Sequence, residues 1–213
     1  EWYGDPRDLR SFPTRRSSGL PDDTFSRTGH GLDTEEYVRL WHSLEAGINN
    51  PTFPLLLVEK VSAEVFDPPL FAALCSTNMM QAVQRLARYK LLIAPMVLET
   101  TVDQAGILTI SPRWLSSAAN IPMSLQLAEL AFLLRLARLA TREPVRALKV
   151  VLPQLPVGAL ADHCRQFFGT TISRAEKPAI SFSSADALRP FLTVNEGMWQ
   201  VFEPELRRRL SEL

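Results

Sequence analysis

The most constraining feature of the sequence is a long apolar run, IPMSLQLAELAFLLRLARLA, at residues 121–140. As a helix, this run is long enough to cross a lipid bilayer. Three charged residues lie inside it, Glu129, Arg135 and Arg138, and charges near the centre of a spanning helix are costly in lipid. The run therefore predicts a helix at about 123–141 that is buried in the core of a soluble domain.

Leucines recur along this run at helical spacing, at Leu127, Leu130 and Leu134. Such a stripe either forms a seam between two subunits or packs inside its own chain. A helix that is apolar on all sides is typically buried within the chain. We take these three leucines as candidate dimerisation residues, with burial inside the chain as the alternative.

The composition allows a substantial core and sets limits on the partners. Of the 213 residues, 46% are hydrophobic and 22% are charged, and the formal net charge is zero, so nothing draws this chain electrostatically to nucleic acid or to an anionic membrane. Two cysteines cannot form a disulfide framework, and the first residues contain no apolar signal sequence. We therefore expect a cytoplasmic protein that does not bind a membrane.

The hydrophobic period changes along the chain. It is helical in the first half, beginning with a helix capped by Asp33 and ending at Gly47, and a later helix is capped by Asn78. It then alternates with period two in MVLETTV and GILTISP, and again in TTISR and AISFS, which we expect to pair mostly as hairpins. The pattern predicts an α+β fold in one domain, with helices packed on a small, mostly antiparallel sheet.

The sequence contains no phosphate-binding glycine loop, nucleophile elbow, paired metal-binding histidines or Cys-x-x-Cys pair. His163 and Cys164 are adjacent, but neighbouring helix residues point about 100° apart and do not face each other. We therefore expect neither an enzyme nor a bound metal or cofactor.

Five segments in order, CSTNMMQAVQRLARYKLLIAPM, LAELAFLLRLARL, PVRALKVVLPQL, CRQFFGTTISRAEKPAISFSSADALRPFL and the closing ELRRRL, resemble the amino-terminal domain of bacterial AraC/XylS-family transcription regulators. The subgroup is the arabinose-binding type, similar to ornithine-utilisation regulators. Many members have glycines where this chain has Ala72 and Ala73, which puts the backbone geometry before Cys75 in doubt.

The resemblance implies a division of the chain. Residues 32–194 would form a ligand-sensing and dimerisation domain, and 195–213 a connecting helix toward a DNA-binding domain of two helix-turn-helix units that this chain does not contain. Residues 1–31 are expected to be a disordered or artefactual arm. The implied partners are a small-molecule effector, a second copy of the chain and, through the absent domain, DNA.

Four residues are candidates for effector binding: Cys75, Met79, Arg85 and Tyr89. An arginine can bind a carboxylate through two hydrogen bonds, a tyrosine hydroxyl can orient a ligand, and methionine suits an adaptable pocket. Each also has a structural alternative, as a solvent-facing charge or as part of the core. Two other functions stay open: an interaction module without a ligand, and a small-molecule enzyme.

Overall fold

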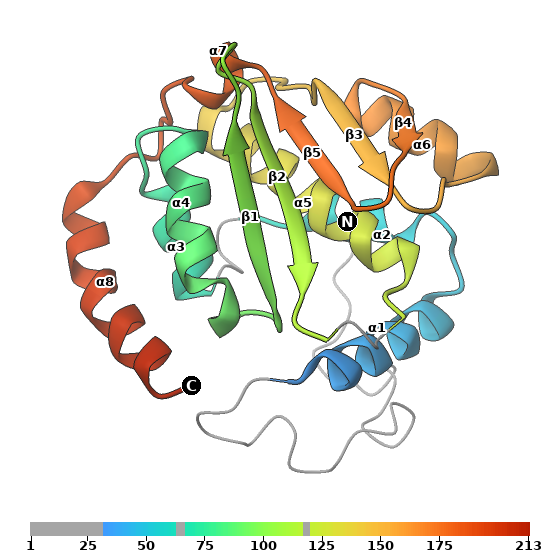
Figure 1. Cartoon of the computed structure of the whole chain (residues 1–213), viewed down its shortest axis with the longest axis horizontal. Coiled ribbons are helices and arrows are strands. Elements are labelled where there is room, and N and C mark those ends of the chain that lie inside the picture. The colour runs from blue at the N-terminus through green and yellow to red at the C-terminus, as the bar shows by residue number, and fades with distance from the viewer. Residues whose placement is uncertain (1–31, 63–66, 117–119) are drawn as a thin grey trace, which may run out of the picture.

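The computed structural model describes residues 32–62, 67–116 and 120–213 (Figure 1). The arm expected at residues 1–31 lies outside the described residues. The helices are α1 (Thr34–Ile48), α2 (Phe53–Lys60), α3 (Pro68–Leu74), α4 (Met79–Tyr89), the short 3-10 turn η4 (Lys90–Leu92), α5 (Met123–Thr141), α6 (Gly158–Phe168), α7 (Ser184–Ala187) and α8 (Glu196–Ser211). The strands are β1 (Met96–Val102), β2 (Leu108–Trp114), β3 (Lys149–Leu152), β4 (Ile172–Arg174) and β5 (Ala179–Phe182).

The five strands form one sheet in the order β1-β2-β5-β3-β4. All neighbours are antiparallel except β3 and β4, which run parallel. The predicted α+β class is confirmed, but TTISR and AISFS do not form a hairpin. Helix α6 connects β3 to β4 as a crossover, which makes that pair parallel, and β5 pairs instead with β2 and β3.

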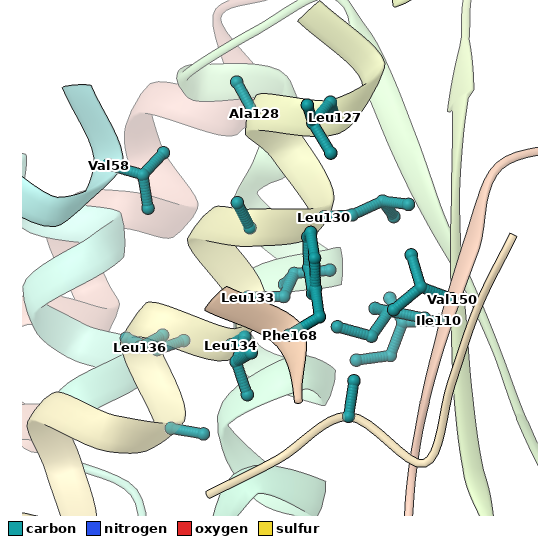
Figure 2. Close-up of a cluster of buried hydrophobic side chains, with 14 of the residues drawn as sticks. Val58, Ile110, Leu127, Ala128, Leu130, Leu133, Leu134, Leu136, Val150 and Phe168 are labelled. Atoms are coloured by element: carbon teal, nitrogen blue, oxygen red, sulfur yellow. The ribbon is translucent and has the colours of Figure 1, made fainter. Parts of the chain in front are cut away.

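The long apolar helix occupies the centre of the fold, as predicted. Helix α5 packs against β2 and β3 on one side and against α2 on the other. Figure 2 shows Leu127 and Leu130 on the side of the sheet residues Ile110 and Val150. None of the described helices combines the length and hydropathy required to span a bilayer.

The charged residues within α5 all have partners. Glu129 binds Lys90, Arg135 donates to the Val61 carbonyl, and Arg138 donates to the carbonyls of Val145 and Phe167. A buried polar group costs free energy unless it is hydrogen-bonded. These contacts explain how a helix with three internal charges can lie in a protein core.

The predicted dimerisation residues are inside the chain. Leu127, Leu130 and Leu134 have no exposed surface, because the sheet and its neighbouring helices cover this side of α5. Their side chains therefore pack within the subunit, and a subunit seam would have to use other residues.

The first helix shows how local signals set its ends. Asp33 accepts a hydrogen bond from the Glu36 backbone, and the Glu36 side chain accepts one from the Asp33 backbone, which is the expected capping box. The helix does not stop at Gly47. It continues to Ile48, and the left-handed C-cap is Asn49, two residues after Gly47, with a φ of 48°.

Candidate functional site

Helix α4 divides the predicted effector residues between two environments. Its Asn78 cap accepts a hydrogen bond from the Gln81 backbone, which sets the start of the helix. Met79 and Leu86 are fully buried in the main hydrophobic core. Tyr89 belongs instead to a separate cluster formed with α8. Met79 is therefore a core residue and does not lie with the other candidates.

The second cluster joins α8 to the end of α3 and to α4. We call it the α8-docking cluster. Its rings contact across the helices: the centroids of Tyr89 and Trp199 are 6.1 Å apart, and those of Phe71 and Phe202 are 5.5 Å apart. The buried members are Ala72, Cys75, Tyr89, Trp199 and Leu206, with Phe71, Leu92, Met198, Phe202 and Leu210 partly buried around them.

Arg85 makes the main polar attachment between α4 and α8. Its side chain is only 10% exposed, and its guanidinium carbon lies 4.0 Å from the Trp199 ring centroid. One terminal nitrogen is 2.9 Å from a Glu196 carboxylate oxygen, and the other donates to the Ser76 hydroxyl at 3.4 Å. A partly desolvated cation over an indole ring is worth about 1–2 kcal/mol.

The segment before α8 is tied to the end of α3 by its backbone. The Thr193 hydroxyl donates to the Leu74 carbonyl at 2.6 Å, and the Asn195 backbone N–H donates to the Cys75 carbonyl at 3.1 Å. Asn195 also caps α8 through the Met198 N–H. The start of α8 is thus fixed to the same turn that carries Cys75.

The Cys75 thiol is placed for packing. It is buried, and that burial raises the pKa of Cys75, although the Arg85 charge acts in the opposite direction. The thiol therefore stays protonated near neutral pH and is a weak nucleophile. Ala72 is also buried in this cluster, so its methyl group contributes to the contact with α8.

The other cysteine is no closer to a catalytic arrangement. Cys164 is buried, and burial raises the pKa of its thiol to about 12. The neighbouring His163 pairs through Nε2 with Glu59 at 3.2 Å. His163 thus pairs with a carboxylate of α2, whereas Cys164 lies in the hydrophobic core.

Three of the four predicted residues, Cys75, Arg85 and Tyr89, come together at one site, and that site is the attachment surface of α8. Sequence reasoning did not identify Trp199 and Glu196 as their partners. Trp199 lies three residues before Phe202 and seven before Leu206, so helical spacing alone places it on the apolar stripe of α8.

We expect the free energy of unfolding of the Arg85→Lys variant to be about 1 kcal/mol lower than that of the wild type. Lysine cannot stack its charged group flat on Trp199 and lacks the forked hydrogen bonding of the guanidinium. Urea denaturation measures this directly. The matched control is Arg88→Lys. The Arg88 side chain is 51% exposed, and its guanidinium nitrogen lies 3.5 Å from a Glu203 carboxylate oxygen. Such exposed ion pairs contribute about 0–1 kcal/mol. Equal losses of unfolding free energy in the two variants would show that Arg85 stabilises the attachment of α8 no more than an exposed arginine does.

The sequence matches the family model for the arabinose-binding domain of AraC transcription regulators, N-terminal, over residues 13–191. No curated protein matches it. Among solved structures, the transcriptional regulator CdpR from Pseudomonas aeruginosa is similar, with a TM-score of 0.58 and 12% sequence identity. That match covers 98% of this chain and 67% of the CdpR chain. At this identity the likeness shows a shared fold alone.

Proposed function

The chain belongs to the family of AraC transcription regulators through their amino-terminal arabinose-binding domain, and from this premise we propose that it senses a small-molecule effector and relays the signal through α8. The receiver would be a helix-turn-helix DNA-binding domain.

The observation that carries the proposal is the way α8 is attached. It lies at the edge of the molecule, outside α3 and α4 (Figure 1), and contacts mainly α3 and η4. Only Trp199 and Leu206 are buried along its length. A helix held by one small cluster can leave it at modest cost, because little apolar surface is exposed when it does.

Two positions of α8 would provide the switch. An effector shifts such an equilibrium only by the difference between its affinities for the two states. Binding that favours the docked helix would hold the DNA-binding domain in one orientation, and binding that favours the released helix would free it. Arg85, which joins α4 to Trp199 and Glu196, is the residue whose contacts would change most.

We also propose that the domain forms a homodimer, since regulators that bind paired half-sites are commonly dimeric. The seam would not involve the buried leucines of α5. Analytical ultracentrifugation of this chain tests the dimer, and a monomer at high micromolar concentration would contradict it.

The proposed effector sensing is tested by a thermal-shift screen against amino acids, fatty acids, aromatic acids and sugars. A compound that binds only the native state raises the melting temperature in proportion to the logarithm of its concentration. We expect one chemical class to do so. A dimer that binds no member of any class would favour the alternative of an interaction module without a ligand.

A further inference from the structure

The face of the sheet opposite α5 carries a row of polar side chains. Ile110 and Val150 are fully buried and lie on the side of α5 (Figure 2). Because side chains alternate between the two faces of a strand, their neighbours Thr109 and Lys149 lie on the opposite face. In Figure 1 this face is turned toward the viewer, and α5 lies behind the sheet. We call it the outer face.

A pair of hydroxyl groups lies at the centre of the outer face. Strand pairing places Thr109 of β2 opposite Ser181 of β5, and Ser181 opposite Lys149 of β3. The Thr109 and Ser181 hydroxyl oxygens are 2.8 Å apart and share a hydrogen bond, and Ser181 is only 7% exposed. That bond uses one of the two hydroxyl protons. The other proton has no acceptor among the described residues, so the pair can donate it to a ligand.

A hollow of about 460 Å³ lies over this hydroxyl pair. Its apolar lining comes from Ile107, Leu148, Val151 and Ala179. Leu148 is 49% exposed, so a ligand in the hollow would remove apolar surface from water. The volume, and the combination of an apolar lining with a few polar groups, are typical of small-molecule sites. We call it the outer hollow.

Two opposite charges line the outer hollow from different strands. Lys149 begins β3 and Asp103 follows the end of β1, and β2 and β5 lie between them. The Asp103 Oδ1 atom accepts the backbone N–H groups of Ala105 and Ile107, each at 2.9 Å, which fixes the carboxylate in the turn between β1 and β2. Neither Asp103 nor Lys149 has an ion-pair partner in the described part of the chain. Both charges are therefore available to a ligand.

We propose that the outer hollow binds the effector, and that the effector is a short zwitterion with a carboxylate and an ammonium group at opposite ends of an apolar chain. This rests on the proposed function of effector sensing. The carboxylate accepts from Lys149 and from the hydroxyl pair, and the ammonium group donates to Asp103. Neighbouring strands are about 4.8 Å apart, so two charges separated by two strands suit a ligand whose own charges are separated by a spacer.

The position of the outer hollow connects it to α8. Asp103 and Gly106 belong to the turn between β1 and β2, which lies beside α7 (Figure 1). This turn packs closely on α7, because a Cβ atom at Gly106 would lie only 2.6 Å from Ser184 Oγ. Helix α7 also contacts α4, and it is the last element before α8. A ligand held by Asp103 thus acts on a turn that contacts the element leading into α8.

The test is an NMR titration of the backbone amide signals of the whole chain at constant ionic strength. The probe is 5-aminopentanoate, which has a carboxylate and an ammonium group at the two ends of a four-carbon spacer. Pentanoate lacks the ammonium group, and pentylamine lacks the carboxylate. Norvaline is an isomer of the probe and carries both charged groups at one end. The indole N–H of Trp41 is the internal reference, because it already donates to the Ser124 hydroxyl at 3.0 Å.

We expect 5-aminopentanoate to shift the Thr109 and Ser181 amide signals saturably and to leave the Trp41 indole signal in place. Pentanoate, pentylamine and norvaline should each bind about three- to fivefold more weakly, because each forms only one of the two ion pairs at this partly exposed site.

Two variants assign the charges. In Asp103→Asn, which keeps an oxygen for the turn, 5-aminopentanoate should bind no better than pentanoate. In Lys149→Met it should bind no better than pentylamine. Lys60→Met is the control, because Lys60 is an exposed lysine on α2, on the other side of α5, and should leave all affinities unchanged.

The proposal is overturned if the Thr109 and Ser181 signals do not move, if norvaline binds as well as 5-aminopentanoate, or if either variant keeps the preference that it should lose. An effector found by thermal shift that leaves the Thr109 and Ser181 signals unmoved would refute this site and leave the proposed sensing function standing.

Discussion

The Leu134→Asp variant is expected to lose about 4 kcal/mol or more of its free energy of unfolding. Leu134 has no exposed surface, and Figure 2 shows it on α5 within the cluster of buried hydrophobic side chains. A carboxylate there would lose its hydration without gaining a hydrogen-bond partner. Since a domain is stable by only about 5–15 kcal/mol, the variant should be partly or wholly unfolded at room temperature by circular dichroism and urea titration.

Leu57→Asp is the matched control for this substitution. Leu57 also lies on a helix, α2, but is 43% exposed, so an aspartate at this position keeps most of its water. We expect a loss of about 1 kcal/mol or less. If Leu134→Asp folded well and sedimented as a monomer beside a dimeric wild type, α5 would be an exposed seam and the fold described above would be wrong.

The Lys90→Met variant should lose about 3–5 kcal/mol, because it leaves the Glu129 carboxylate buried without its cation. The double variant Lys90→Met/Glu129→Leu removes both charges. It should recover most of the loss, since replacing a buried pair by apolar residues is often close to neutral. The measurement is again urea denaturation of the wild type, the two single variants and the double variant as a cycle.

The surface pair Arg113–Glu99 provides the control for this cycle. Its side chains are 54% and 47% exposed, so Arg113→Met should change the free energy of unfolding by less than about 1 kcal/mol. A Lys90→Met loss no larger than that of Arg113→Met would show that the Lys90–Glu129 pair is open to water and not buried.

Features with a local physical cause could be predicted from the sequence. The capping box at Asp33, the Asn78 cap, the span of α5 and the strands β1 and β2 each depend on residues close together in the chain. The pairing of β4 could not be predicted, because two short strands joined by a turn normally form a hairpin. Here the crossover through α6 places β4 beside β3, and this depends on tertiary packing.

The candidate site was predictable in part for the same reason. Cys75, Arg85 and Tyr89 lie at the end of α3 and along one α4 face, so local spacing groups them. Their partners on α8 lie more than a hundred residues away, as with Glu196 and Arg85, which are separated by 111 positions.

We propose that α8 is a separately attached helix through which this domain signals. Hydrogen exchange along α8 in this chain, in the wild type and in Arg85→Ala, tests it most directly. In the wild type we expect protection at Leu206, which is fully buried, and fast exchange at the exposed Ser211, because short unsupported helix ends fray. In Arg85→Ala, exchange from Trp199 to Leu206 should rise about tenfold or more while α5 stays unchanged, since the lost contacts are worth at least about 1.4 kcal/mol. Uniform strong protection to the end of α8, with opening only when α5 also opens, would show that α8 is an integral part of the core and is not separately attached.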